Sequence, residues 1–496
     1  MGADSTATPR TDGHSANRVG SVTAQLARYI VDARLQDFPP EVIRKAALCL
    51  LDSIGCSMAG SHTRRGDILY SLLTPVAEGG MQIFGRQFRT TPYEAVFYNA
   101  LTANFLELDD SYDRPGSIMF AHPGANVVPP VLALAQMRGA SGQEVLEAIV
   151  VGYETCLRVG AAIQPSYRRA TEEVWGCATF QTFGSVAAAA KLLKLDLEQT
   201  LNALGIAGAT APVPSTLKVW RDDHPDMHNG YGWAAEAGLR AALIAERGYT
   251  APHDILDGNN GFWRMYGSDQ CDFALFTEGL GKRFAILDVA FKPWPACRWT
   301  HPVMDAGKAL TERQGLRLRT LEDIERVRKV TVRIFAQATR YPYANYKPGT
   351  LLEGQFSTPF CAAAALLRVW PEESLFRSGG MCDPRLPALM GKIELQVDPG
   401  AEAAFPGNGG DALSAGMTVE TRDGTYDIFI PAPFGDRRNP MELDDLIAKF
   451  HSSNANRITK TEVSSIADTV IALCDDVPAA PLLAMLSHAA TVEAAF

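Results

Sequence analysis

The chain has 496 residues, of which 47% are hydrophobic and 21% charged, and its formal net charge is −10. This length exceeds what one simple core usually supports, so two domains are expected. The acidic balance argues against a general nucleic-acid or membrane-surface binder, because such proteins need a basic face. An anionic small molecule remains compatible with it, since a few local cations suffice to bind one.

The N-terminal residues, 1–20, lack the apolar centre of a signal peptide and are expected to form a disordered leader. No later apolar run is long enough to span a bilayer. The nine cysteines include no CxxC pair, and their odd number argues against a complete disulfide framework. These features predict a cytoplasmic protein in a reducing environment.

The first half of the chain predicts one helix after another. FPPEVIRKAALCLLDSIGCSMAGS, residues 38–61, opens with prolines and closes with glycine and serine, as helices often do. Ser141 precedes an apolar run, and Glu144 follows three residues later in a capping-box pattern. The stretch 183–209 is rich in alanine and leucine, which suits close contact between helices. A further helix is expected to end at Gly248.

The pattern changes near Ile286. The alternation of apolar and polar residues in 326–338 and 391–399 predicts strands, and 416–433 predicts a hairpin around Asp423 and Gly424. Two helices, over 301–314 and 356–369, are expected between these strands.

From Asn439 the chain is expected to become helical again, with Asn439 as the cap and Pro440 as the first helical residue. The predicted fold is therefore mostly α. A large helical domain comprises 21–285 and returns in 435–496, and a smaller α+β lid domain comprises 286–434. A cleft between two such domains is a natural small-molecule site.

The first candidate motif is ELDDSYD, in which Asp109, Asp110 and Asp113 spell DDxxD. On a helix these carboxylates could hold Mg²⁺ against a diphosphate, as in terpene synthases. The following residues, RPGS, would end such a helix at once, and no second metal motif is found. A solvated acidic helix end is an equal alternative.

The second motif, HPDMH, places His224 and His228 four residues apart, a spacing that can bind zinc on a helix. Pro225 and the loop-like surroundings oppose a helix, and the sequence offers no obvious third ligand. No metal is therefore predicted, and a role for His228 without a metal is preferred.

The third motif is MFAHPGANVVPP, which places His122 just before an apolar helix. A helix N-terminus lowers the pKa of a histidine and favours a neutral imidazole that can act as a base. A histidine in a surface loop is the alternative.

The fourth motif is FKPWPACRWTH, a loop stiffened by two prolines. Lys292, Arg298 and His301 could converge on carboxylates, and arginine can contact a carboxylate through two N–H groups. Cys297 is either a buried apolar residue or a proton donor. Together with the acidic motif and His122, this loop indicates chemistry on a polycarboxylate.

The sequence contains no GxGxxG after a strand, no P-loop, no GxSxG and no HExxH. No cofactor is therefore expected. Acid–base chemistry by side chains alone agrees with the absence of these motifs.

Several ordered motifs between about residues 24 and 486 resemble the MmgE/PrpD family, whose members include 2-methylcitrate dehydratase, cis-aconitate decarboxylase and iminodisuccinate epimerase. They are LLDSIGC, ELDDSYD followed by HPG, FGSVAAAAKLL, GWAAEAGLRAALIAERGYT, GFW, FKPWPACRWTHPVMDA and EGQFSTPFCAAAALL. The resemblance implies a helical domain with an α+β lid, usually a homodimer, and an active site between the two domains.

The resemblance also implies a set of site residues. Those that match the family pattern are Glu107, Asp109, Asp110 and His122, Ser111 in place of a threonine, Lys292, Cys297 and His301 of the lid loop, and Tyr343 with Asn345 in a Tyr-x-Asn context.

Two positions depart from the pattern. The histidine expected before the alanine-rich helix is replaced by Trp175 or Gly176, and the lysine expected before GWAA has become Met227 or His228, with Lys218 as a distant substitute. The loss of these groups implies a larger or less charged substrate, which Trp175, Trp220 and Trp233 could help to enclose.

Elimination from a β-hydroxy acid needs a base, an acid and cations that hold the carboxylates. We expect His122 to act as base or acid, oriented by Asp109 or Asp110. Lys292 and Arg298 are expected to bind carboxylate, and Tyr343 or His301 to relay protons. The expected substrate-binding residues are Glu107, Ser111, Trp175, His228, Cys297, Arg298 and Asn345.

The predicted function is a cofactor-independent lyase, a dehydratase or decarboxylase, that acts on a small organic acid. The same residues could support an isomerase, epimerase or cyclase on a less charged secondary metabolite. A catalytically silent binding or scaffold protein is the alternative from another class.

Overall fold

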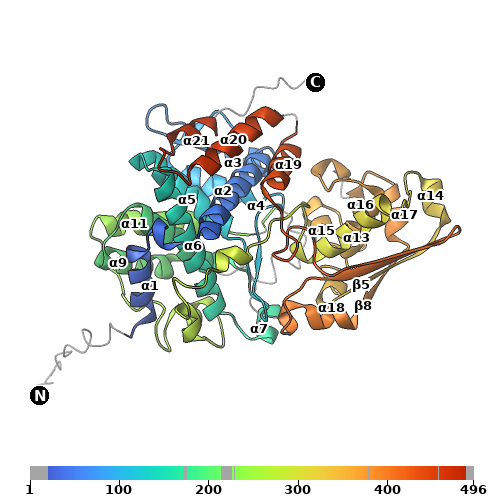
Figure 1. Cartoon of the computed structure of the whole chain (residues 1–496), viewed down its shortest axis with the longest axis horizontal. Helices are drawn as coiled ribbons and strands as arrows, with labels where there is room; N and C mark the ends of the chain where they lie inside the picture. Colours follow the sequence, from blue (N-terminus) through green and yellow to red (C-terminus); the bar gives the residue numbers. More distant parts are fainter. Residues whose placement is uncertain are drawn as a thin grey trace, which may run out of the picture.

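The computed structural model describes residues 20–172, 176–213, 226–227, 229–377, 380–455 and 457–486. Figure 1 shows a larger helical part beside a smaller α+β part, and each part has its own hydrophobic core. None of the helices within these ranges combines the length and the hydropathy needed to cross a membrane.

The helical part begins with one long series of helices. They are α1 (Val22–Asp32), α2 (Pro40–Gly60), α3 (Arg64–Tyr70), α4 (Pro92–Asn104), α5 (Pro123–Arg138), α6 (Gly142–Ala162), α7 (Tyr167–Glu172), α8 (Ala178–Leu192), α9 (Leu197–Thr210), α11 (Tyr231–Glu246) and α12 (Phe262–Tyr266). The predicted capping box at α6 is confirmed, because Ser141 and Glu144 cap each other's backbone N–H groups.

The alanine-rich stretch that we expected to be helical throughout is divided into α8 and α9. Lys194 adopts a left-handed backbone conformation with φ of 56°, which ends the first helix. Asp196 then begins the second helix with a capping box of its own. Small residues bring α8 close to α6: a Cβ atom added at Gly184 would lie 2.7 Å from the Cβ of Cys156.

Short antiparallel pairs join some of these helices. They are β1 (Met81–Gln82) with β2 (Arg89–Thr90), and β3 (Tyr112–Asp113) with β4 (Phe120–Ala121). The second pair leads directly from the DDxxD segment to the histidine of the third motif. The hairpin thus brings these two parts of the sequence together.

The α+β part is built on a four-stranded sheet with the order β10-β9-β5-β8. Its strands are β5 (Val327–Ile334), β8 (Ile393–Val397), β9 (Ala415–Thr421) and β10 (Thr425–Ile430), and only β5 and β8 run parallel. The predicted hairpin around Asp423 and Gly424 is confirmed as β9 and β10. A small pair, β6 (Phe376–Arg377) with β7 (Gly380–Met381), lies apart from this sheet.

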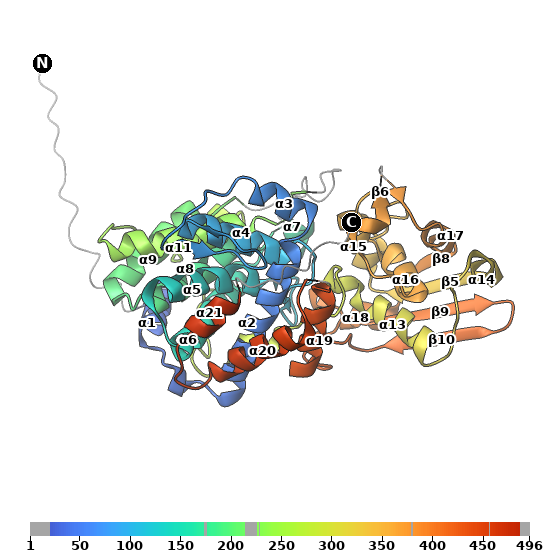
Figure 2. The same ribbon diagram turned by 90° about the horizontal axis from the view of Figure 1, so that it is seen from above.

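The helices of this part are α13 (His301–Glu312), α14 (Leu321–Arg326), α15 (Leu351–Phe356), α16 (Thr358–Leu367), α17 (Arg385–Met390) and α18 (Pro399–Ala404). Helix α13 packs against α16 and against strands β9 and β10 (Figures 1 and 2). Together with the sheet they enclose the second core.

The last helices, α19 (Leu443–Ser453), α20 (Lys460–Ala472) and α21 (Ala480–Met485), return to the helical part and pack beside α2 and α5 (Figure 2). The prediction that Asn439 caps the first of them was wrong. Asn439 instead closes a turn by donating its N–H to the carbonyl of Asp436, and α19 begins three residues after Pro440 with a capping box between Glu442 and Asp445.

The two connections between the parts lie side by side. The N–H of Phe291, on the way into the α+β part, donates to the carbonyl of Gly435, on the way back, at 3.0 Å. A Cβ atom at Gly435 would lie 1.9 Å from the Phe291 carbonyl oxygen, so only glycine permits this approach.

Candidate active site

An acidic loop, residues 105–111, follows α4 and is held by its main-chain carbonyls. Lys292 Nζ donates to the carbonyl of Glu107 at 3.2 Å, and Lys449 Nζ donates to that of Leu108 at 2.6 Å. His122 Nδ1 lies 3.0 Å from the carbonyl of Asp110. Side chains from three distant segments therefore hold the main chain of this loop at Glu107, Leu108 and Asp110.

The side chains of the loop form a buried cluster of charges. Lys292 Nζ lies 3.0 Å from Glu107 Oε2 and 3.6 Å from Asp109 Oδ1, and the lysine side chain is completely buried. Burial alone would lower the pKa of Lys292, but the Glu107 and Asp109 carboxylates raise it above its ordinary value. Asn104 Nδ2 donates to Asp109 Oδ1 at 2.9 Å and completes the cluster.

His122 is the N-cap of α5, and both its main-chain N–H and its main-chain carbonyl form hydrogen bonds with Gln181. Its N–H donates to Gln181 Oε1 at 2.7 Å, and Gln181 Nε2 donates to its carbonyl at 3.0 Å. Because a carbonyl oxygen can only accept, the contact with Asp110 places a hydrogen on Nδ1. Nε2 has no hydrogen-bond partner among the described residues, so it is the ring atom that can exchange a proton with a ligand.

The charge of His122 differs from the sequence-based expectation. Burial and Lys292 lower the pKa of His122, but Asp109 and Glu107 outweigh them and raise it above its ordinary value. Asp109 Oδ2 lies 3.4 Å from Nδ1, and His122 and Lys292 hold the pKa of the Asp109 carboxyl below its ordinary value despite burial. The expected effect of the helix N-terminus is overridden, because the nearby Asp109 carboxylate favours the imidazolium form of His122.

A small cavity of about 30 Å³ lies between the two parts of the molecule. The helical part contributes Glu107, Ser111, Asp113, Phe120, His122 and Asn229, and the α+β part contributes Cys297, Arg298, Trp299, Tyr343 and Phe356. Reciprocal main-chain hydrogen bonds between Ser111 and Ala290 join the two walls at one edge.

Arg298 brings a guanidinium group to this cavity. Its Nη2 donates to Asp436 Oδ2 at 2.7 Å, and its Nε lies 3.5 Å from Asp113 Oδ2. The buried Nε and Nη1 atoms have no hydrogen-bond partner. The two N–H groups of Nη1 are therefore suited to hold a carboxylate.

Cys297 and Tyr343 lie on the wall formed by the α+β part, with Sγ and the phenol oxygen 4.0 Å apart. Burial raises the pKa of the Cys297 thiol to about 12, and burial beside Cys297 raises that of the Tyr343 phenol well above its ordinary value. Both groups therefore keep their protons at neutral pH and are weak proton donors.

Other predicted residues lie away from the cavity. His301 is completely buried, its Nε2 donates to the carbonyl of Ala296 at 3.0 Å, and burial with the nearby Arg298 lowers its pKa well below the ordinary value. Asn345 accepts from the N–H of Lys347 in a local turn. Lys292 does not line the cavity either, because Glu107 and Asp109 enclose it.

Part of the prediction falls on residues outside those that the structure describes, namely Trp175, Lys218, Trp220, His224 and His228. Of the neighbouring candidates, Trp233 is 46% exposed and packs against Phe97 with ring centroids 4.9 Å apart. Within the described residues, no group of three or more histidine, cysteine or acidic side chains is arranged to hold a metal ion.

The DDxxD aspartates occupy the acidic loop and β3, and not the helix that a diphosphate site would require. Their carboxylates face three different partners: Asp109 faces Lys292, Asp110 faces the core, and Asp113 faces Arg298. They do not share the one face that a magnesium cluster needs.

The side chain of Asp110 points away from the cavity. Its Oδ1 accepts from the N–H of Gly124 at 3.0 Å, and its Oδ2 accepts from the Tyr153 hydroxyl at 2.6 Å. Only its main-chain carbonyl contacts His122. Burial raises the pKa of the Asp110 carboxyl from 3.8 to about 7.

This raised pKa predicts how stability depends on pH. The folded protein keeps the Asp110 proton to about pH 7, whereas the unfolded chain loses it near pH 4, so this group's stabilising contribution declines as pH rises between those values. Relative to wild type, Asp110→Asn should become more stable by about 1.4 kcal/mol per pH unit over this window. Urea unfolding at pH 5, 6 and 7 measures the difference.

The exposed Asp468→Asn variant is the matched control and should differ from wild type equally at all three pH values. A constant difference for Asp110→Asn as well would contradict the assignment of a raised pKa to this carboxyl.

Several residues of the site were missed by the sequence-based prediction. Gln181 was detectable, because it is a lone amide in an alanine-rich helix that is buried on all sides. Asn104, Asn229 and Lys449 gave no such signal, since a polar residue near a helix end is ordinary. Lys449 reaches the acidic loop only because the C-terminal helices return to α2.

The chain was compared with known proteins. Residues 24–274 match the MmgE/PrpD N-terminal domain, and residues 294–473 match the MmgE/PrpD C-terminal domain. Cis-aconitate decarboxylase from Mus musculus is 26% identical over 495 residues, which is 95% of this chain and 94% of that protein.

Two further relatives also align with most of the chain. Cis-aconitate decarboxylase from Aspergillus terreus is 24% identical over 95% of this chain and 97% of its own length. For 2-methylcitrate dehydratase from Cupriavidus necator the identity is 23%, over 84% of this chain and 87% of that protein. The two domain matches follow each other in the order of the two structural parts. The chain therefore belongs to the MmgE/PrpD family.

Proposed function

We propose that this protein is a cofactor-independent lyase that acts by acid–base chemistry on an organic carboxylic acid. One observation carries the proposal: the same cavity is lined by His122, which is paired with Asp109, and by Arg298, whose Nη1 has no hydrogen-bond partner. The names of the relatives, two decarboxylases and a dehydratase of carboxylic acids, support the reaction class.

The proposed reaction begins when Arg298 binds a substrate carboxylate through Nη1. In a decarboxylation, the bond to a second carboxylate breaks and CO₂ leaves. The electron pair remains on the substrate, and His122 Nε2 delivers its proton to carbon. Asp109 stabilises the imidazolium before that step. The Asp109 carboxylate favours the imidazolium form of His122. This favours decarboxylation over dehydration, because dehydration would need His122 to begin as a base.

In a dehydration, a neutral His122 would remove the proton next to the carboxylate. The electron pair would form the double bond, and the hydroxyl would leave with a proton from Tyr343 or Cys297. His122 on one wall of the cavity and Cys297 and Tyr343 on the other would also serve an isomerase that removes and returns a proton.

Three further expectations remain part of the proposal. We place the protein in the cytoplasm, and the nine cysteines, all free, support a reducing compartment. We propose a homodimer as its assembly. We also propose that 21–285 with 435–496 form one domain and 286–434 another, and the two separate cores support this division.

A screen tests the proposed function. The purified chain is incubated with cis-aconitate, 2-methylcitrate and larger or less charged analogues, and the products are analysed by mass spectrometry. We expect a loss of 44 mass units from one of these acids, and the activity should survive EDTA and exhaustive dialysis. A loss of 18 units would indicate dehydration, and a new isomer of unchanged mass would indicate isomerisation.

Arg298→Lys is the control for the cavity. It keeps a charge opposite Asp436 but loses the planar pair of N–H groups, so product formation at low substrate concentration should fall steeply. If the folded wild-type protein converts none of these acids, the lyase proposal fails in favour of a silent binding protein.

A further inference from the structure

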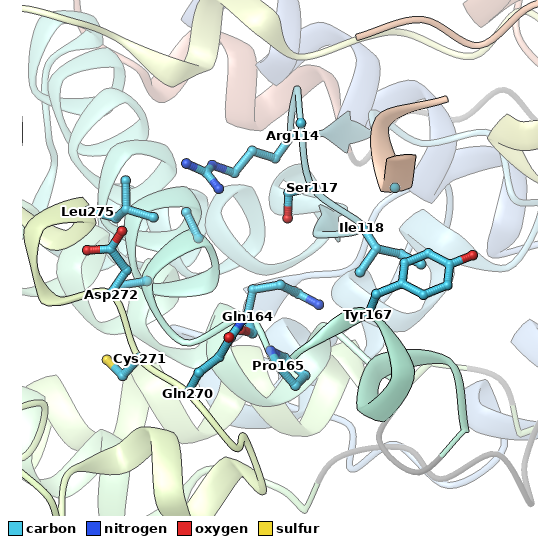
Figure 3. Close-up of a pocket in the computed structure, with 14 residues that line it drawn as sticks. Arg114, Ser117, Ile118, Gln164, Pro165, Tyr167, Gln270, Cys271, Asp272 and Leu275 are labelled. Carbon is cyan, nitrogen blue, oxygen red and sulfur yellow. The ribbon is translucent and has the colours of Figure 1, made fainter. Parts of the chain in front are cut away.

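A second cavity of about 400 Å³ lies behind the β3–β4 hairpin, and we call it the vestibule (Figure 3). The hairpin contributes Arg114 and Ser117, the end of α6 leads to Gln164, and the opposite wall carries Asp272 and Leu275. Gly407 of the α+β part also lines it, so the vestibule lies at the junction of the two parts. Its volume falls in the range of small-molecule sites.

Arg114 differs from the other cations of this region. Lys292 and Arg298 are both engaged by buried carboxylates. The half-buried Arg114 side chain has no hydrogen bond or ion pair with any described residue. Figure 3 shows its guanidinium pointing across the cavity toward the wall of Leu275 and Asp272, and Asp272 forms no ion pair with it.

The vestibule is connected to the candidate active site through shared lining residues. Ile118 and Gln164 line both the vestibule and a narrow cavity of about 20 Å³. Phe120 and Trp299 line that narrow cavity and also the cavity that contains His122 and Arg298. Three adjoining cavities therefore lie between Arg114 and the reacting groups, separated by these shared side chains.

The hairpin that separates the cavities is tied to the α+β part at its tip, where the N–H of Gly116 donates to the carbonyl of Gly410 at 2.7 Å. This contact fixes the side of the vestibule that carries Arg114. The backbone that carries Arg114 is therefore fixed, while its guanidinium has no hydrogen bond or ion pair with a described residue.

We infer that the vestibule is a docking site for the carboxylate substrate on its way to the active site, and that Arg114 captures it there. The inference rests on the proposed function. A chain with a net charge of −10 repels anions overall, so a free local cation in a concave site has a large effect on their arrival. The captured acid then passes Ile118, Phe120 and Trp299 and exchanges Arg114 for the spare N–H groups of Arg298.

Kinetics test this inference through Arg114→Gln, with the acid that the screen identifies. We expect kcat/KM to fall about tenfold at low ionic strength, with kcat changed by less than about twofold, because Arg114 touches no reacting atom. Added salt should lower kcat/KM of the wild type much more than that of the variant. The matched control is Arg313→Gln, an exposed arginine at the end of α13, which should retain the wild-type values.

A binding measurement separates this inference from the reaction. Tricarballylate carries three carboxylates but has no hydroxyl or double bond, so it can dock without reacting. Calorimetry at low salt should show binding to the wild type and to Arg313→Gln, and much weaker binding to Arg114→Gln. This result would support the docking site even if no acid in the screen is converted and the lyase proposal fails.

Ile118→Trp provides a third measurement, because it narrows the passage while leaving Arg114 in place. It should lower kcat/KM by a larger factor than it weakens tricarballylate binding. The inference is overturned if Arg114→Gln matches Arg313→Gln in both tricarballylate affinity and the salt dependence of kcat/KM.

Discussion

Replacing His122 by glutamine is expected to lower kcat by about 10²–10⁴-fold, which is the range lost with a general acid or base. Glutamine can still donate to the Asp110 carbonyl, so the acidic loop should keep its conformation. It cannot carry a proton to carbon, and KM should change little because Arg298 is untouched. Product formation by mass spectrometry, with circular dichroism to verify folding, measures both effects.

The pH profile gives a sharper test of the role of His122. Asp109 and Glu107 raise its pKa, so a rate that needs the imidazolium should be high at low pH and decline as the pH rises through that raised value. Asp109→Asn removes the nearest carboxylate and should move this decline to lower pH.

The control for His122 is His451→Gln, at the end of α19, whose side chain has no hydrogen bond or ion pair with a described residue. It should behave as the wild type. An unchanged kcat in His122→Gln would show that the proton is delivered by another group, and a decline that does not move in Asp109→Asn would disprove the proposed pair.

Replacing Lys292 by methionine should destabilise the protein by about 3–5 kcal/mol, the range observed when one partner of a buried ion pair is removed. Methionine has nearly the same length, so the loss is one of charge and not of volume. The carboxylates of Glu107 and Asp109, both at most 2% exposed, would lose the lysine charge that both now contact. Urea unfolding measures the change.

A second substitution distinguishes this charge effect from a packing effect. Adding Glu107→Gln to Lys292→Met removes one of the two carboxylates that contact Lys292 in the wild type. This double variant should regain part of the lost stability. The exposed Lys460→Met variant should have wild-type stability. If the double variant is no more stable than Lys292→Met, repulsion between the carboxylates is not the cause.

Much of the helical architecture was predictable, because caps and apolar runs act locally. The capping box of Ser141 and Glu144 and the hairpin at Asp423 needed no information from distant residues. Asn439 misled the prediction because asparagine before proline is typical of a helix start. In the structure Asn439 belongs to a turn with Asp436, and the helix starts after Glu442 instead.

Only part of the predicted set of site residues comes together around one cavity. The sequence cannot distinguish Asp109 from Asp110, yet one carboxylate pairs with His122 and the other faces Tyr153 in the core. Lysine and arginine in one loop looked equivalent, but Lys292 is enclosed by acidic side chains whereas Arg298 has N–H groups to spare. The contacts that distinguish these two cations join residues more than one hundred positions apart.

The return of the C-terminal helices has a consequence for biosynthesis. Asp52 in α2 and Leu108 in the acidic loop are both bound by Lys449, which lies 397 residues after Asp52 in the chain. A ribosome must therefore complete the whole α+β part before the cation for Asp52 exists. Until then the carboxylate of Asp52 lacks the ion pair that it forms in the finished structure. The acidic loop thus cannot complete its buried contacts until Lys449 has been synthesised and α19 has packed against α2.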